Sequence, residues 1–303
     1  MPKKPQGLRV QRMIRGSLLD KHIDIKVAGS RFLIDFLGIP AQVFSDIRHD
    51  LIDFKTFSSE APCAHIKFEC VGSLGDNSIS SIGDLITFDR IGSRIHMVGS
   101  GIVGEWGNRT PIDIIVKLPS TASHITTALL AFFVYHGASI GSVFFHASSV
   151  MICREGHLFI GLSDAGKSTI AKHLGGKSHE VLGEEFGCIR LIDNEQITLY
   201  PVPFDPVRHH GGYHVFDIIR PLKHIWHLSK ESSGLYIARK FSVSESVATL
   251  FQHTLGIIAG KNYSETVLDH ITNISRLLHV ENLAREDPKK MVKYIEDSGI
   301  LRS

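Results

Sequence analysis

The chain has 303 residues, of which 43% are hydrophobic and 21% are charged, so it can bury a substantial core and is long enough for one large or two modest domains. Its 33 basic and 31 acidic residues leave a formal net charge of +2, which excludes an overall field that would recruit nucleic acid or an anionic membrane. The four cysteines, at positions 63, 70, 153 and 188, form neither a CxxC pair nor a secreted-type framework, which favours free thiols in a reducing cytoplasm.

The N-terminal segment is basic but lacks the apolar core and cleavage site of a signal peptide, so we expect a solvated tail. Its basic residues are Lys3, Lys4, Arg9, Arg12 and Arg15. A second segment, residues 125–145, is the most membrane-like of the chain, but His136, Gly137 and Ser139 interrupt it. Its first half is predicted to be a buried helix capped by Ser120, so we predict no transmembrane span and no membrane partner.

The first part of the chain, up to residue 118, alternates apolar and polar residues in short runs. This pattern predicts the strands of a small, mostly antiparallel layer. The runs are residues 22–27, 65–70, 85–88, 94–98 and 112–118. A Gly/Ser-rich break lies at residues 72–78, and the region contains no internal repeat and no motif that carries chemistry.

The second part, residues 119–303, is predicted to mix helices and strands. It starts with a helix over residues 121–136 that ends at Gly137, and a strand over residues 142–152 then turns at residues 154–156 into the next apolar run. The further predicted strands are residues 157–160, 180–182, 187–192, 196–202 and 224–228, and the further helices are residues 167–174, 244–259, 264–278 and 287–297. The turn at residues 193–195 makes the strands on either side of it a hairpin.

The strongest motif of the chain follows the apolar run 157–160 and opens the helix 167–174. Its residues are Gly161, Leu162, Ser163, Asp164, Ala165, Gly166, Lys167, Ser168 and Thr169. This pattern is a complete phosphate-binding P-loop, in which the glycines let backbone N–H groups turn around a phosphate, Lys167 reaches the β and γ oxygens, and Ser168 binds a magnesium ion. ATP and Mg²⁺ are therefore the expected ligands. The alternative is a glycine-rich turn with a chance lysine.

Two further features have a characteristic spacing from the P-loop. His146 lies 15 residues before Gly161, and the adjacent acids Glu184 and Glu185 begin 23 residues after it. With the hairpin that feeds the P-loop, a departure from the usual βαβ arrangement, these features resemble the HPr serine kinase family and, more distantly, ATP-dependent phosphoenolpyruvate carboxykinases. The resemblance covers about residues 120–300. It implies an α/β fold with a mixed-sheet P-loop kinase core of that type, here with a small N-terminal mostly antiparallel β layer and C-terminal helices.

The chain also departs from the bacterial regulatory enzyme of this family. That enzyme has acids where Leu162 and Thr169 stand, aspartates where Glu184 and Glu185 stand, and a glycine-rich signature segment that is missing here. These departures argue against phosphorylation of HPr itself. The chain is more similar to HPr-kinase-related proteins of peptide-modification clusters, including kinases that phosphorylate serine on lasso-peptide precursors, and the family's hexamer suggests a homo-oligomer.

The resemblance implies a role for each acid. It puts Glu184 near the acceptor as the candidate base and Glu185 near the metal, with Ser168 as the second metal contact. Because successive strand residues point to opposite faces, both acids can serve one site only if the strand ends there and the backbone turns, which Gly183 and Gly187 permit. The alternative is an exposed acidic strand end.

Three other basic positions are weaker candidates. His146 is predicted to contact the γ-phosphate or assist proton transfer, with a buried structural histidine as the alternative. Arg208, beside His209 and His210 in an irregular loop over residues 203–213, is a candidate for neutralising charge on the transferred phosphoryl group. Arg239 and its neighbour Lys240 are candidates for holding an acidic peptide or a phosphate, although surface solvation is the favoured explanation for both. No spacing in the chain is that of a zinc site.

We therefore expect a cytoplasmic ATP-dependent kinase that transfers the γ-phosphoryl group to a hydroxyl, in particular a serine of a peptide or small protein, with residues 1–118 recognising the acceptor and residues 119–303 forming the catalytic domain. A small-molecule acceptor is the first alternative. The second is a nucleotide-binding regulatory module, in which glutamates longer than the family's aspartates misplace the base or the metal. A GTPase or ATPase switch is disfavoured because no NKxD-like segment follows the P-loop.

Overall fold

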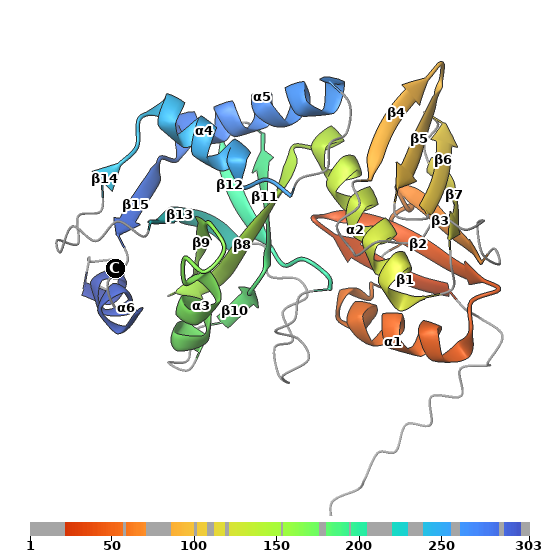
Figure 1. Ribbon diagram of the computed structural model, residues 1–303, viewed down its shortest axis with the longest axis horizontal. Helices are drawn as coiled ribbons and strands as arrows, with labels where there is room; N and C mark the ends of the chain where they lie inside the picture. The colour runs from red at the N-terminus through yellow and green to blue at the C-terminus, as the bar shows by residue number, and fades with distance from the viewer. Residues whose placement is uncertain are drawn as a thin grey trace, which may run out of the picture.

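A computed structural model describes residues 22–56, 59–70, 86–99, 102–107, 112–118, 121–152, 154–175, 180–193, 195–204, 220–229, 239–255, 261–284 and 288–297 of the chain. Within these residues the protein builds two sheets with helices packed on them (Figure 1). None of the described helices is long and apolar enough to cross a membrane.

The first sheet has seven strands in the order β1-β2-β3-β7-β6-β5-β4. The strands are β1 (His22–Val27), β2 (Ser30–Leu37), β3 (Ala64–Cys70), β4 (Thr87–Ile91), β5 (Arg94–Gly99), β6 (Ile102–Gly107) and β7 (Ile112–Leu118). β3 pairs in parallel with both β2 and β7, and the other neighbours are antiparallel, so the expected mostly antiparallel layer forms. The helix α1 (Ala41–Leu51), the short 3-10 helix η1 (Ile52–Phe54), β2 and β6 were not predicted.

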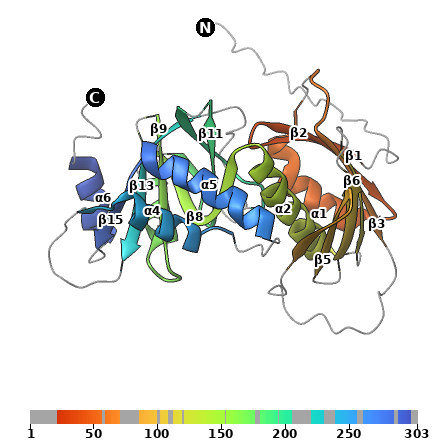
Figure 2. The same cartoon turned by 90° about the horizontal axis from the view of Figure 1, so that it is seen from above.

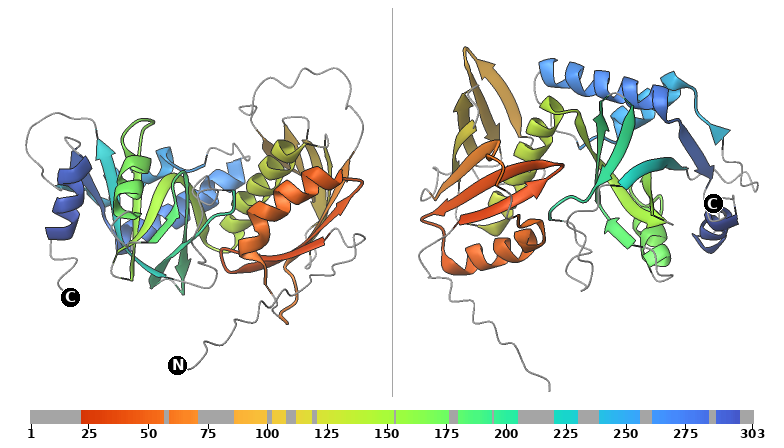
Figure 3. Two further views of the ribbon diagram at one scale, coloured as in Figure 1. Left: turned by 90° about the horizontal axis from the view of Figure 1, so that it is seen from below. Right: turned by 180° about the vertical axis from the view of Figure 1, so that it is seen from behind.

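The helix α2 (Ala122–Ser139) packs with α1 against the first sheet, and Figure 3 shows both helices on the same face. The contact is aromatic: the Phe32 ring of β2 lies 5.9 Å from Phe132 and 5.1 Å from Phe133, and Trp106 of β6 lies 5.6 Å from Phe132. Large aromatic rings bury much apolar surface, so this cluster holds α2 on the first sheet. The division of the chain after residue 118 stays a prediction.

The second sheet has eight strands and contains the P-loop strand. Its strands are β8 (Ser142–Ile152), β9 (Glu155–Gly161), β10 (Glu180–Gly183), β11 (Phe186–Ile192), β12 (Gln196–Tyr200), β13 (Arg220–Ser229), β14 (Arg239–Lys240) and β15 (Val280–Ala284). β8 and β9 form the expected antiparallel hairpin, and β11 and β12 form the second one. β9 also pairs in parallel with β13, so the P-loop strand lies inside the sheet.

Helices cover both faces of the second sheet (Figures 1 and 2). The helices α3 (Lys167–Gly175) and α6 (Pro288–Asp297) share a hydrophobic cluster on one face, while α4 (Val243–Gln252) and α5 (Lys261–Leu277) share the cluster on the other. The two sheets meet where the β1–β2 turn contacts β11: the Arg190 guanidinium donates a hydrogen bond to the carbonyl of Ala28 at 3.0 Å. The two halves are therefore joined by polar contacts as well as by packing.

Two predictions about α2 were wrong. The residue that caps the helix is Thr121, whose hydroxyl accepts a hydrogen bond from the amide of His124, and not Ser120. The helix also continues past Gly137 to Ser139. A Cβ at Gly137 would lie 2.7 Å from the ring of Phe144, so this glycine permits close packing of α2 on β8 and does not end the helix.

Most other boundaries differ by a few residues. β4 spans residues 87–91 where residues 85–88 were predicted. α4 ends at Gln252, earlier than predicted, because the chain then turns through residues 253–255 to bond to the edge of β8, with Thr254 opposite Phe145. The predicted loop at residues 203–213 and the Gly/Ser-rich break at residues 72–78 lie wholly or mostly outside the described residues. β15 was not predicted.

The buried His136 gives the fold a pH dependence. It is 9% exposed, its ring lies 5.4 Å from that of Phe32, and burial, with a contribution from Arg190, lowers its pKa from 6.5 to about 4. The unfolded chain therefore binds one more proton than the folded chain between these values, and stability falls as the pH falls through this window. When the pH falls from 7 to 5, we expect the free energy of unfolding to fall by on the order of 1 to 2 kcal/mol more in the wild type than in His136→Leu. Urea denaturation at both pH values measures this, and equal losses would contradict it.

Candidate active site

The predicted P-loop connects the end of β9 to the start of α3, and its two glycines have conformations that other residues avoid. Gly161 has a φ of +152°, and a Cβ there would lie 2.8 Å from the carbonyl oxygen of Leu228 on β13. Gly166 has a φ of +100°. The backbone turn of the motif therefore requires both glycines, and it presents the N-terminus of α3, a ready anion-binding position, to the pocket.

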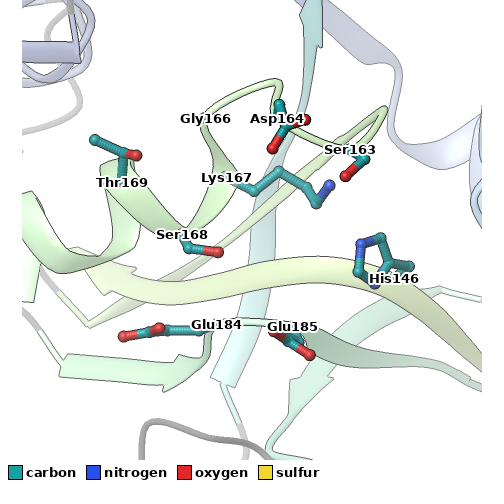
Figure 4. Close-up of a pocket in the computed structure, with 9 residues that line it drawn as sticks. All are labelled: His146, Ser163, Asp164, Gly166, Lys167, Ser168, Thr169, Glu184 and Glu185. Carbon is teal, nitrogen blue, oxygen red and sulfur yellow. The ribbon is translucent and has the colours of Figure 1, made fainter.

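A pocket of about 330 Å³ opens in front of this loop (Figure 4). It brings together residues from β8, the P-loop, α3 and the junction between β10 and β11. The residues that line it are His146, Ser163, Asp164, Gly166, Lys167, Ser168, Thr169, Glu184 and Glu185. Nine of the residues that the sequence marked as candidates therefore lie around one cavity, although they span almost 40 positions of the chain, while Gly161, Leu162 and Ala165 of the motif do not line it.

The ammonium group of Lys167 bonds to its own loop. Its side chain is largely buried, and Nζ donates hydrogen bonds to the carbonyls of Gly161 at 2.9 Å and Leu162 at 3.0 Å. Burial lowers the pKa of Lys167, and the charges of Asp164 and Glu185 oppose that shift. A phosphate in the pocket would offer this cation better acceptors than two loop carbonyls, because hydrogen bonds between charged groups are the stronger ones.

His146 is the only exposed residue of β8, whose other residues, from Ser142 to Ile152, are all buried. Its backbone N–H donates to the carbonyl of His253 at 2.9 Å, so the strand is fixed while the ring faces the pocket. Burial and the charge of Lys167 lower the pKa of His146, while Glu185 raises it. The alternative of a buried structural histidine is therefore wrong. Because the pKa is lowered, the ring is neutral at pH 7 and both accepts and donates hydrogen bonds.

The two acids lie at a break in the ribbon that pairs with β8. The register of β10 on β8 shifts by one residue between Val181 and Gly183, and the chain bends at Glu184 and Glu185 before β11 begins. Because β10 ends at Gly183 and the chain bends at the two acids, the alternation of a strand does not apply to them and neighbouring residues can line one pocket. The Ser148 hydroxyl fixes the bend by donating to the carbonyl of Glu184 at 2.5 Å.

The acids differ in their surroundings. Glu184 is 9% exposed, and its carboxylate lies 3.3 Å from Nζ of Lys172 on α3. Glu185 is exposed, and its charge affects the pKa of both Lys167 and His146. Figure 4 shows the two carboxylates pointing in opposite directions. The alternative explanation, an exposed acidic strand end, therefore does not apply to Glu184.

The donor set suits a magnesium ion. The Ser168 hydroxyl points into the space between the P-loop and the two acids (Figure 4), and hydroxyl and carboxylate oxygens are ligands that Mg²⁺ prefers. Among the described residues no group of three or more His, Cys, Asp and Glu side chains gathers as a metal site. Mg²⁺ is usually held by one or two protein carboxylates together with substrate phosphates, so Ser168 and Glu185 are a fitting pair.

Other candidates lie elsewhere. Arg208 is outside the described residues. Arg239 and Lys240 are exposed on β14, and Arg239 bonds to Glu245 at 2.9 Å, so neither lines the pocket and surface solvation explains them. Sequence reasoning missed Lys172, although its spacing of four residues from Ser168 puts both on the same face of α3 and was a usable signal.

Comparisons with known proteins add little. No family model matches the chain, and no curated protein matches it. Among solved structures, the chain is similar to the Hpr(Ser) kinase/phosphatase from Coxiella burnetii, with 11% sequence identity, a TM-score of 0.32 and coverage of 52% of this chain and 97% of that chain. A likeness at this level carries no argument, so the interpretation of the site depends on its geometry.

The first test of the site is removal of its buried cation. We expect Lys167→Ala to weaken triphosphate binding about 10- to 100-fold, since the variant loses charged hydrogen bonds to the phosphates. Isothermal titration calorimetry measures the affinity, and the control is Lys223→Ala, which removes an exposed lysine paired with Glu155 at the far end of β9. Equal affinity in wild type and Lys167→Ala would show that the P-loop does not bind the triphosphate.

Proposed function

We propose that the protein is an ATP-dependent kinase that transfers the γ-phosphoryl group to a serine hydroxyl of a peptide or small protein. The observation that carries the proposal is the pocket in which the P-loop faces His146, Glu184 and Glu185. Phosphoryl transfer needs positioning and charge stabilisation more than covalent work by the protein, and this set of groups suits both tasks.

The P-loop side of the pocket binds the triphosphate in this proposal. Backbone N–H groups at the start of α3 and the ammonium of Lys167 hold the β and γ oxygens, for which Lys167 leaves the carbonyls of Gly161 and Leu162. Ser168 and Glu185 hold the magnesium ion, which supplies neutralisation of the phosphate charge when bound. Asp164, exposed on the loop, is close enough to Lys167 to influence its pKa.

The opposite side of the pocket serves the acceptor. Glu184 accepts the proton of the attacking hydroxyl, and its carboxylate is held 3.3 Å from the ammonium of Lys172. His146, neutral at pH 7, donates a hydrogen bond to an oxygen of the transferred group from the exposed position of β8. The choice of a serine peptide as acceptor comes from the sequence resemblance.

Replacing the proposed base separates transfer from binding. We expect Glu184→Gln to bind ATP about as well as the wild type and to lower the transfer rate roughly 100- to 10,000-fold, the usual contribution of a general base. The assay uses magnesium and γ-labelled ATP with serine-containing peptides encoded beside the protein's own gene, and mass spectrometry locates the phosphate. The matched control is Glu155→Gln, which removes another lysine-paired glutamate from outside the pocket.

Each outcome of this assay has a distinct meaning. A phosphoserine that forms with the wild type and Glu155→Gln but not with Glu184→Gln supports the proposal. Full activity of Glu184→Gln would show that another residue is the base. ATP binding without transfer to any peptide or small hydroxyl compound would instead indicate a nucleotide-binding regulatory module, and label transfer to a small molecule alone would change the acceptor class.

A further inference from the structure

The ion pair between Lys172 and Glu184 joins α3 to the acidic bend. The two atoms, Nζ and Oε2, lie 3.3 Å apart, and the side chain of Lys172 is 64% exposed while that of Glu184 is 11% exposed. Such a half-exposed pair contributes little to stability, because water screens it and the lysine loses entropy. The main consequence of the pair therefore concerns the pocket, which Glu184 lines.

The position of Lys172 on α3 gives this pair a geometric role. Ser168 and Lys172 are four residues apart, so they lie one turn apart on the same face of the helix, which packs against β8 and β10. The helix thereby presents a hydroxyl and an ammonium group along the acidic bend. The hydroxyl of Ser168 points into the pocket, and the ammonium of Lys172 bonds to Glu184.

The backbone at the bend is held by hydrogen bonds, so the position of the Glu184 carboxylate depends on its side chain. The carbonyls of Glu184 and Glu185 accept hydrogen bonds from the Ser148 hydroxyl at 2.5 Å and the Ala147 amide at 3.0 Å, so both acids are anchored to β8. Two adjacent carboxylates on a fixed backbone would both be attracted to a divalent cation, because Mg²⁺ and Mn²⁺ take carboxylate oxygens as ligands. An ammonium group bound to one carboxylate weakens that competition.

We propose that Lys172 is a positioning residue that divides the work of the two acids: it binds the carboxylate of Glu184, keeps it away from the metal position, and so reserves it for the acceptor hydroxyl. This inference deepens the proposed kinase function and rests on it. It predicts that loss of the Lys172 charge changes metal binding and turnover without changing folding or the affinity for metal-free nucleotide.

The test measures Mn²⁺ binding and turnover in matched variants. In Lys172→Met, Glu184 is released toward the metal, so we expect about tenfold tighter Mn²⁺ binding in the presence of a non-hydrolysable ATP analogue, measured by electron paramagnetic resonance. We also expect kcat to fall at least about tenfold with little change in KM for ATP, because the base is misplaced. Lys172→Arg keeps the charge and should stay near the wild type in both measurements.

Two controls make the result specific. Lys223→Met removes the same charge from the pair with Glu155, outside the pocket, and should change neither Mn²⁺ affinity nor kcat. Adding Glu184→Gln to Lys172→Met should abolish the gain in Mn²⁺ affinity, since the released carboxylate is then missing. Thermal melting of each variant confirms that it is folded.

The outcomes separate this inference from the proposed function. Unchanged Mn²⁺ affinity in Lys172→Met, or a change that Lys223→Met reproduces, overturns the role of Lys172 even if the wild type is an active kinase. Tighter Mn²⁺ binding in Lys172→Met that depends on Glu184 supports the metal part of the inference even if the wild type transfers phosphate to no acceptor, in which case the kinase proposal alone fails.

Discussion

The pairing of β8 on both of its edges is the constraint on which the site depends. One edge holds β9, which leads into the P-loop, and the other holds the ribbon of β10 and β11, which carries the acidic bend. Because strands in a sheet are about 4.8 Å apart, this arrangement puts the phosphate loop and the carboxylates on either side of one central strand. His146 belongs to that strand, so the hydrogen bonds of β8 help to position all three parts of the pocket.

Local patterns predicted the second sheet better than the first. The limits of β8 match the predicted residues 142–152, because a mostly apolar run between two turns is a strong signal of a buried central strand. The parallel pairing of β3 with β2 and β7 was not predictable, since alternation along a strand does not reveal the direction of its neighbours. The prediction that the helix ends at Gly137 was wrong for a related reason. The small size of this glycine makes room for Phe144, a tertiary contact that the neighbouring sequence does not show.

The site was predictable where a motif determines backbone geometry. The P-loop needs glycines at its two turns, so its location followed from spacing alone. For the acids, the sequence supplied the residues and a condition, that the strand ends there and the backbone turns, and the end of β10 at Gly183 with the bend at Glu184 and Glu185 meets that condition. The contact with Lys172 depends on how α3 docks beside the bend, a tertiary relation that helical spacing suggests only once the acids are placed on that side of the helix.

The length of Glu184 and Glu185 is the main argument against catalytic activity. The extra methylene gives each carboxylate one more rotatable bond than an aspartate would have. A base misplaced by about an ångström costs a large factor in rate, so added freedom is harmful unless something removes it. The ion pair removes it for Glu184, whose longer side chain extends from the bend to an ammonium on α3. Glu185 stays exposed and electrostatically coupled to Lys167 and His146, where a ligand with phosphate oxygens and a cation would order it. The substitution of longer acids is thus compatible with catalysis when each has a different partner.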